Sequence, residues 1–266
     1  MKTLIYDNEC PLCVAYTGAF VKTGLLEKEG RKNFSEVDNA ILCNVDTARM
    51  HNEIPLIETE TGKVWYGIDA LLEVLGAKLP FIKTIGKLTA VNWLLKKLYK
   101  LVSYNRKVIV AVSAKGYDCS PDFNVRYRIF FLLIGLVFNS WFFTLNIPLF
   151  IRNVFPAADA LTMQAAHFSL VAINICMAVM LGQKRGLEYL GQVNMLALLT
   201  MLLILPFKCL SGLFSQQLVQ LYFGAVFFFI AGEYIRRMKY ASIFRTGKFV
   251  VLVNIICLCI LLMILS

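Results

Sequence analysis

The chain has 266 residues, of which 58% are hydrophobic and only 17% are charged, and its mean hydropathy is +0.66. An ordinary soluble domain is roughly half apolar and about a quarter charged, so this composition excludes a single soluble globule as well as a disordered or collagen-like chain. Residues 1–126 hold 17 of the 27 basic and 14 of the 17 acidic residues. We therefore expect a soluble N-terminal part and a membrane part behind it.

The N-terminal part alternates between short apolar runs and helical patterns. In chain order we expect a strand at residues 3–7, a helix at 11–28, a strand at 33–37, a hairpin of strands 54–59 and 63–66, and a helix at 68–75 that Gly76 ends. The expected order is β-α-β, a variable helical segment, and then β-β-α.

Residues 89–102 form a further predicted helix. One side carries an apolar stripe of Leu94, Leu95, Leu98, Leu101 and Val102, and the other carries Lys96, Lys97 and Lys100. A basic amphipathic helix beside a membrane span can lie in the lipid interface. The stripe can equally pack on the soluble domain, and the sequence leaves both possibilities open.

Five apolar stretches are candidates for membrane-spanning helices, at residues 127–151, 163–182, 186–207, 217–235 and 249–265. At 1.5 Å rise per residue, about 20 residues cross the roughly 30 Å of hydrocarbon. The fifth stretch is short, and the second contains His167 and Asn174. A bundle folded in water is disfavoured, because five such helices leave too little polar surface to cover them.

The short loops indicate the orientation of these spans. A cytoplasmic N-terminus places eight basic residues on the inner side and two, Arg152 and Lys208, on the outer side. The eight are Arg128, Lys184, Arg185, Arg236, Arg237, Lys239, Arg245 and Lys248. Positive charge gathers on the cytoplasmic side of membrane proteins, so we expect a plasma or inner-membrane protein with a cytoplasmic N-terminal domain and an external C-terminus. The same placement of the bases argues against a nucleic-acid partner for the +10 net charge.

The most informative local pattern is Cys10-Pro11-Leu12-Cys13, directly between the first predicted strand and helix. The free N–H groups and the positive dipole end of a helix stabilise an anion, so the pKa of Cys10 should be lowered. Cys13 lies one turn further on the same face and can attack a mixed disulfide formed at Cys10. The pair is therefore a candidate dithiol–disulfide couple.

Two other interpretations of the cysteine pair remain open at this point. A zinc site needs two more ligands, and the nearby candidates, Cys43 and His51, stand at the wrong spacing. Inert buried cysteines are the second alternative. Redox chemistry is the favoured interpretation, because two cysteines at one helix start rarely arise by accident.

The segment Tyr6-Asp7-Asn8-Glu9-Cys10-Pro11-Leu12-Cys13 resembles the signature of the DCC family of thiol-disulfide oxidoreductases, which begins Tyr-Asp-Gly-x-Cys-x-Leu-Cys. Asn8 replaces the glycine, a mild change because Asn tolerates a left-handed backbone. Gly67-Ile68-Asp69-Ala70 is similar to the family's Gly-x-x-Ala helix start. The run from Tyr99 to Asn105-Arg106 is similar to its closing segment. The resemblance covers about residues 3–110 and does not extend to the membrane part.

The family resembles thioredoxin-fold proteins, and this resemblance implies further site residues. In that fold a cis-proline before the third strand lies against the cysteines, and Pro55 stands at the corresponding place. Its role would be to expose the backbone of Ile54 for pairing with a substrate chain; the alternative is a trans proline that opens an edge strand. Asp7 either acts as the base that deprotonates Cys13 or only accepts backbone N–H bonds in the turn.

We expect an α/β thioredoxin-like N-terminal domain plus an all-α transmembrane helical bundle. The predicted boundaries are 1–110 for the redox domain, 111–126 for a juxtamembrane linker and 127–266 for the membrane domain. The predicted function is thiol–disulfide exchange with a protein or small-molecule thiol, using Cys10, Cys13, Asp7 and Pro55 and requiring no metal or organic cofactor. The alternative is a transporter or assembly protein whose thioredoxin-like module only docks.

Overall fold

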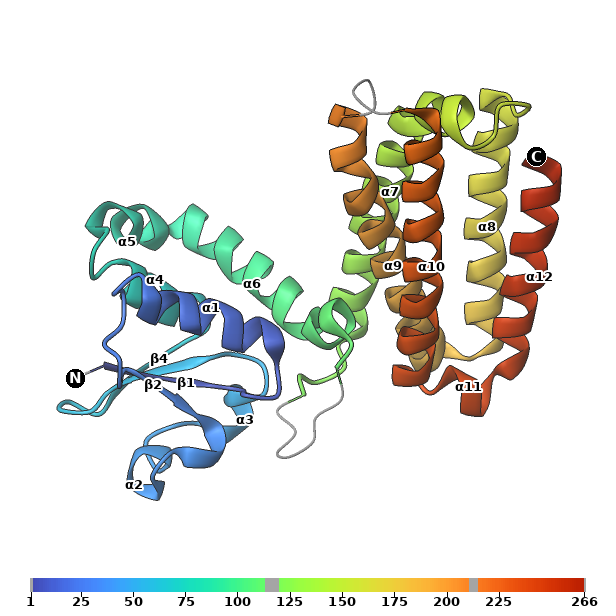
Figure 1. The fold of residues 1–266 in the computed structure, drawn as a ribbon. Coiled ribbons are helices and arrows are strands. Elements are labelled where there is room, and N and C mark those ends of the chain that lie inside the picture. Colours follow the sequence, from blue (N-terminus) through green and yellow to red (C-terminus); the bar gives the residue numbers. More distant parts are fainter. Residues whose placement is uncertain (1, 113–119, 211–214, 266) are drawn as a thin grey trace. The chain divides into compact units, whose positions relative to one another are not determined.

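Figure 1 shows the fold as a computed structural model, which describes residues 2–112, 120–210 and 215–265, without the side chains of residues 39, 40, 209, 210 and 246. The chain divides into two compact units, Met1–Arg128 and Ile129–Ser266. In the described residues, the first unit combines a sheet with helices and the second is helical.

A four-stranded sheet forms the centre of the N-terminal unit. Its strands are β1 (Lys2–Tyr6), β2 (Arg31–Asn33), β3 (Pro55–Glu58) and β4 (Lys63–Tyr66), in the spatial order β2-β1-β3-β4. β1 is parallel to β2 and antiparallel to β3, and β3 is antiparallel to β4. Parallel neighbours need a crossover, which helix α1 (Pro11–Lys22) provides. The predicted thioredoxin-like order of elements is confirmed.

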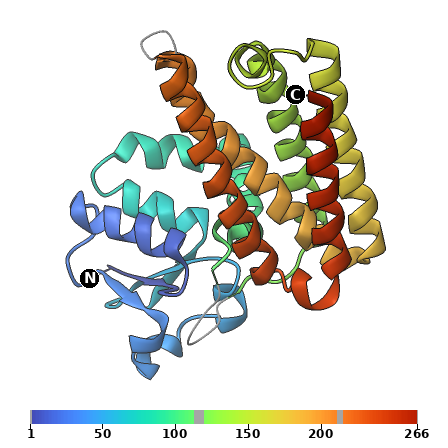
Figure 2. The same cartoon turned by 45° about the vertical axis from the view of Figure 1, so that its right-hand side comes forward.

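The sheet is covered on both faces. The covering elements are the 3₁₀ helix η1 (Phe34–Glu36) and the helices α2 (Asn39–Leu42), α3 (Thr47–Met50), α4 (Ile68–Leu75), α5 (Pro80–Lys87) and α6 (Thr89–Val110). Because side chains alternate along a strand, Leu4 and Leu56 pack towards α1 and α4, whereas Ile5 and Ile57 pack towards the segment that contains η1, α2 and α3. Figures 1 and 2 show these helices on opposite faces of the sheet.

Two elements of the first half differ from the prediction. Helix α1 ends at Lys22 instead of residue 28, because Gly24 adopts a φ of +67° and the amides of Leu25 and Leu26 both bond back to the carbonyl of Phe20. Strand β2 covers residues 31–33 instead of 33–37, since its pairing with β1 places Arg31 opposite Leu4 and the chain then turns into η1.

Helix α6 is longer than predicted and contacts both α1 and α4. The residues after Val102 contain no glycine or proline until Gly116, so the helix continues to Val110. It ends where Ala111 adopts a left-handed backbone with φ +50°. This extension brings residues 103–108, several of them buried, into the N-terminal unit.

Five long apolar helices make the second part of the chain a candidate membrane domain. They are α7 (Val125–Asn153), α8 (Ala160–Met180), α9 (Gln183–Leu210), α10 (Gln216–Tyr240) and α12 (Lys248–Leu265), with the short α11 (Ile243–Thr246) between the last two. Each is long and apolar enough to cross a bilayer. The predicted number of spans agrees with these five helices.

Polar side chains within these helices have partners on neighbouring helices. The His167 ring lies 2.9 Å from the Ser140 hydroxyl, and Asn254 donates to the hydroxyl of Tyr189 at 2.6 Å. Asn139 donates to the side-chain oxygen of Asn194 at 2.8 Å. The Tyr189 hydroxyl in turn donates to the side-chain oxygen of Asn174. Since a polar group in hydrocarbon needs an internal partner, the partners of His167 and Asn174 explain how α8 accommodates the two residues that made its prediction less secure.

Candidate active site

The two cysteines lie where β1 gives way to α1. Cys10 is the N-cap of the helix, with an extended backbone at φ −100° and ψ 104°, and Pro11 takes the first helical position. The Cys10 carbonyl accepts the amide of Val14 at 3.0 Å, which begins the helical ladder. Cys13 is therefore one turn further along, as predicted. Both residues are free thiols, and only 3% of Cys10 and 5% of Cys13 is exposed.

The two sulfurs differ strongly in acidity. A hydrogen bond from the Cys13 side chain lowers the pKa of Cys10 most, burial opposes this, and the positive charge of Arg106 lowers it further, so that the pKa of Cys10 lies at about 6. The same hydrogen bond, together with burial, raises the pKa of Cys13 far above its ordinary value. A thiolate is the nucleophilic form of cysteine. The pair therefore presents one sulfur ionised at neutral pH and one held as a thiol.

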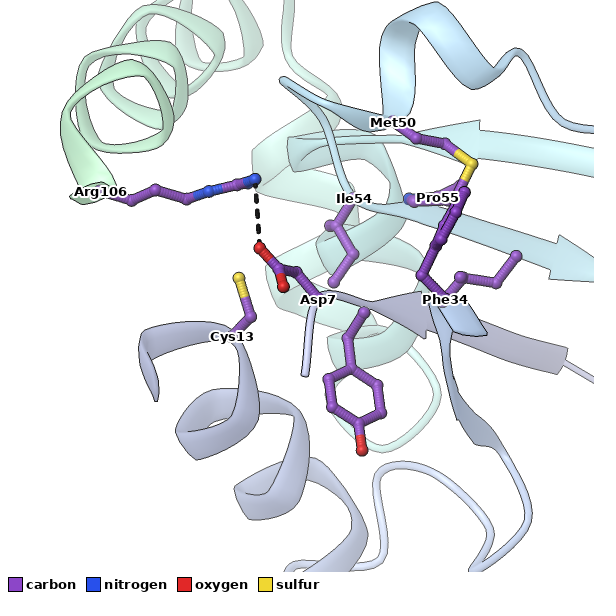
Figure 3. Close-up of a pocket in the computed structure, with 9 residues that line it drawn as sticks. Asp7, Cys13, Phe34, Met50, Ile54, Pro55 and Arg106 are labelled. Carbon is purple, nitrogen blue, oxygen red and sulfur yellow. Dashed lines mark ion pairs between the residues drawn. The ribbon is translucent and has the colours of Figure 1, made fainter. Parts of the chain in front are cut away.

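The two carboxylate oxygens of Asp7 have different partners. Its Oδ1 accepts the backbone N–H of Glu9 at 2.9 Å, which fixes the turn before α1. Its Oδ2 is buried without a hydrogen bond and faces the Arg106 guanidinium, with 3.7 Å between Oδ2 and Nη2 (Figure 3). The carboxylate thus meets the expected turn role through one oxygen and keeps the other available beside Cys13.

Arg106 is a site residue to which the sequence analysis gives no role of its own. It comes from the C-terminal half of α6, is only 7% exposed, and also donates to the carbonyl of His51 at 3.2 Å. Burial acts to lower its pKa, but the neighbouring Cys13, Cys10 and Asp7 outweigh burial and raise it. The guanidinium of Arg106 therefore keeps its positive charge beside Cys10, Cys13 and Asp7.

A signal for Arg106 was present in the sequence. Tyr99, Ser103 and Arg106 stand at i, i+4 and i+7, so they share one face of a helix. In the structure all three reach the residues that precede β3: Tyr99 bonds the amide of Ile54, Ser103 the carbonyl of Asn52, and Arg106 the carbonyl of His51. These polar residues are far from the cysteines in the chain. Their position on one face of the helix is the signal that they belong together.

The prediction of a cis bond at Pro55 is wrong. No cis peptide bond occurs in the described residues, and Pro55 instead opens β3, a position at which proline removes no necessary donor. The backbone of Ile54 is also already paired: its N–H donates to the Tyr99 hydroxyl at 2.9 Å, and its carbonyl accepts the amide of Gly67 at 2.8 Å. Ile54 therefore does not offer these groups to a substrate strand.

Pro55 nevertheless lies beside the redox groups. It lines a small cavity of about 20 Å³ together with Asp7, Cys13, Ile54 and Arg106. Figure 3 shows the side chains of Cys13, Asp7 and Arg106 directed towards one another at this cavity. A space of roughly 10–15 Å³ or more admits one water molecule, so the cavity is large enough for a proton carrier between Asp7 and Cys13 and too small for a substrate.

The alternative of a zinc site finds no support in the described residues. No group of three or more histidine, cysteine or acidic side chains is arranged there to hold a metal. Cys43, one of the two nearby candidates, is exposed.

Comparison with known proteins identifies one family. Residues 4–111 match the family model described as DCC1-like thiol-disulfide oxidoreductase, a stretch that runs from β1 to the end of α6 and includes both cysteines, Asp7 and Arg106. The chain matches no curated protein and no solved structure.

Proposed function

Since residues 4–111 carry a domain of the DCC1-like thiol-disulfide oxidoreductase family, we propose that the protein is a membrane-anchored thiol–disulfide oxidoreductase whose redox centre is the Cys10–Cys13 pair. One observation supports this most strongly: the pKa of Cys10 is lowered to about 6 while that of Cys13 is raised. Such a difference assigns the attacking role to Cys10 and the resolving role to Cys13.

In the first step the Cys10 thiolate attacks one sulfur of a substrate disulfide. The new bond joins Cys10 Sγ to that sulfur as the disulfide bond of the substrate breaks. The departing sulfur leaves as a thiolate and takes a proton from water. Arg106 compensates the negative charge of the attacking sulfur, and its charge is one of the causes that lower the pKa of Cys10.

In the second step Cys13 resolves the mixed disulfide. The Cys13 thiol gives its proton to Asp7, its sulfur bonds Cys10 Sγ, and the remaining substrate sulfur leaves and receives the proton. The protein dithiol has then lost two electrons, and the substrate disulfide has gained them. A second dithiol, supplied by another thiol system, reverses both steps on the protein and restores Cys10 and Cys13.

Whether the protein reduces or oxidises its substrates depends on the compartment that contains the N-terminal unit. The positive-inside distribution of basic residues supports a cytoplasmic N-terminal unit and an external C-terminus. The cytoplasm keeps thiols reduced, so we expect the protein to act there as a reductase of protein or small-molecule disulfides.

A redox titration of the full-length protein in detergent tests the proposal. The protein is equilibrated in buffers of graded potential, and its thiols are trapped with a maleimide that adds mass. We expect a reversible two-electron transition that is absent from both Cys10→Ser and Cys13→Ser and retained in Cys43→Ser, since Cys43 is an exposed thiol outside the pair. If Cys10 and Cys13 never pair at any potential, the thioredoxin-like module only docks, and the catalytic proposal is wrong.

A further inference from the structure

Helix α6 has an unusual orientation on the N-terminal unit. Two of its lysines pair with acidic residues of the domain: Lys96 Nζ lies 2.9 Å from a carboxylate oxygen of Asp69, and Lys100 Nζ lies 3.6 Å from one of Glu53. Other positions of the helix expose large apolar side chains, among them Leu94 and Leu98. A surface helix normally buries its large apolar side chains, so these exposed residues depart from the usual arrangement.

The exposed apolar positions of α6 continue onto α5, which packs against it. Seven large side chains are between 46% and 63% exposed there: Phe81, Ile85, Leu88, Trp93, Leu94, Leu98 and Val102. We call these residues the α5–α6 apolar face. Scattered exposed apolar residues are normal on a soluble protein, but a run of this size along two packed helices marks an interaction surface.

The same helix is joined to the start of the first candidate span within the N-terminal unit. The ring of Tyr104 stacks on that of Tyr127 with centroids 5.1 Å apart, and the Asn105 side chain donates to the Tyr127 carbonyl at 3.2 Å. Tyr127 belongs to the first turn of α7. The C-terminal end of α6 is thus fixed to the point where the chain enters a membrane-spanning helix.

From this we propose that the α5–α6 apolar face lies in the lipid interface of the same membrane that α7 crosses. The composition of the face fits this occupant: apolar side chains lie beside Trp93, and Lys97 holds its ammonium group 5.8 Å from the centre of the Trp93 ring. Tryptophan prefers the depth of the lipid headgroups, and a lysine at the rim can extend its ammonium group to their phosphates.

The contacts of α6 with the domain support lipid as the occupant. Lys96 and Lys100 already hold α6 on the domain through Asp69 and Glu53. The buried side of the helix sets its rotation, because Tyr99 accepts the amide of Ile54 and Arg106 donates to the carbonyl of His51. The domain therefore resolves the choice that the sequence left open for residues 94–102, because most of the stripe does not pack on the soluble domain.

The three tryptophans of the chain provide the test. Full-length variants that keep only Trp93, only Trp65 or only Trp141, with phenylalanine at the other two positions, are placed in nanodiscs of plain or brominated phosphatidylcholine. Trp141 is 61% exposed on the candidate span α7 and serves as the lipid-facing reference. Trp65 lies on β4 with the ammonium groups of Lys2 and Lys63 about its ring and serves as the reference distant from lipid.

An interfacial helix buries its apolar face roughly 5–10 Å into the boundary between headgroups and chains, so brominated lipid should reduce Trp93 fluorescence about twofold. Quenching of Trp93 close to that of Trp141 and well above that of Trp65 supports the proposal. Quenching of Trp93 no greater than that of Trp65 overturns it, because the face is then covered by protein, either by the membrane unit or by a second copy.

A second variant separates lipid contact from folding. Leu94→Asp combined with Leu98→Asp, in the chain that keeps only Trp93, should abolish the additional quenching while leaving the Cys10–Cys13 redox transition intact. Thr61→Asp, at the exposed end of the β3–β4 hairpin, is the matched control and should leave the quenching unchanged. If the leucine variant keeps its transition and its quenching, the face does not lie in lipid.

Discussion

The Cys10 sulfur is largely ionised at neutral pH, since its pKa lies at about 6. Alkylation follows the thiolate fraction, so the rate at which Cys10 reacts with iodoacetamide should rise through pH 5–7 and be half-maximal near pH 6. In Arg106→Met the positive charge is lost, and the midpoint should move to higher pH, by up to about one unit.

Arg106→Lys is the matched control, because it retains a charge at this position. Its midpoint should stay close to that of the original protein. An unchanged midpoint in Arg106→Met, with the redox transition still present, would show that the guanidinium does not set the acidity of Cys10.

The free oxygen of Asp7 predicts a role in the second chemical step. In Asp7→Asn the turn can keep its bond to the Glu9 amide, whereas the base beside Cys13 is lost. A positioned base typically contributes a factor of about 10²–10⁴, so the mixed disulfide at Cys10 should accumulate after reaction with a small disulfide, and its resolution should slow by at least about tenfold.

Rapid-quench mass spectrometry measures that intermediate directly. The defect should shrink as the pH rises, because hydroxide then removes the Cys13 proton without help. Equal resolution rates in the two proteins at pH 7 would leave Asp7 with the turn role alone.

At the scale of single residues, the sequence predicted the features that depend only on neighbouring residues. Cys10 as the N-cap, Pro11 in the first turn and Cys13 one turn later all depend on neighbouring residues, and the structure has them there. Arg106 depends on a contact that spans most of the N-terminal unit; its helical phase with Tyr99 and Ser103 shows a shared face but not which residues that face meets. Pro55 was placed at the start of the third strand, which it opens, but its peptide bond is not cis, and the partners of Ile54 beside it are not visible in the sequence.

At the scale of helices and strands, the carboxylate of Glu73 connects α4 to α5. Glu73 of α4 is 5% exposed and accepts from Lys83 at 2.8 Å and from Lys87 at 3.0 Å, both on α5, while Lys2 of β1 lies 3.4 Å away. Burial acts to raise the pKa of Glu73, but the hydrogen bonds from Lys83 and Lys87 outweigh it and lower the pKa to about 2.

This lowered pKa makes the stability of the N-terminal unit depend on pH. The pKa of an unfolded glutamate is about 4.3, so the contribution of Glu73 is complete above that value and is lost as the pH falls towards about 2. Glu73→Gln should destabilise the unit by about 1–3 kcal/mol at pH 7 and should remove much of the decline in stability between pH 5 and 3.

Thermal unfolding of the full-length protein in detergent, followed through Trp65 fluorescence with the other tryptophans replaced, measures both effects. Glu29→Gln, on an exposed turn, is the control and should behave like the original protein. A variant at Glu73 with the same midpoint and the same pH dependence as this control would contradict the prediction.

The elements that the sequence predicted best are those bounded by residues that start or end a helix, such as glycine. Helix α4 begins after Gly67 and ends before Gly76, as expected, because Gly67 takes a φ of +59° that few other residues adopt. Strand β2 was misplaced because its register depends on pairing with β1. The orientation of α6 could not be derived either, since it depends on contacts of Tyr99 and Arg106 with residues that lie far away in the chain.

For the whole molecule, the five candidate spans and the division into two units were predictable from composition, which changes abruptly along the chain. The observed division falls between Arg128 and Ile129, and α7 begins at Val125, before it. We propose that the functional boundaries are residues 1–110 for the redox domain, 111–126 for the linker and 127–266 for the membrane domain; residues 113–119 of this linker lie outside the described residues.

The proposed orientation of the spans, with the N-terminal unit in the cytoplasm, predicts which thiols a membrane-impermeant maleimide reaches. Cys43 is exposed on the N-terminal unit, so a full-length variant that keeps only Cys43 should label in permeabilised cells and not in intact ones. A variant whose single cysteine is introduced by Ser266→Cys should label in intact cells. Labelling of Cys43 from outside would reverse the topology and would remove the argument for a reductase.

Two adjacent residues of α6 contact two different places, the surroundings of the cysteine pair and the first turn of the candidate span α7. Arg106 faces Asp7 at the redox pair, and Asn105 holds the carbonyl of Tyr127 in the first turn of α7. The redox pair and the first turn of α7 therefore both contact one helix, α6, within the N-terminal unit. With the α5–α6 apolar face in lipid, as proposed, we expect the substrates to be disulfides of molecules at the bilayer surface or embedded in it.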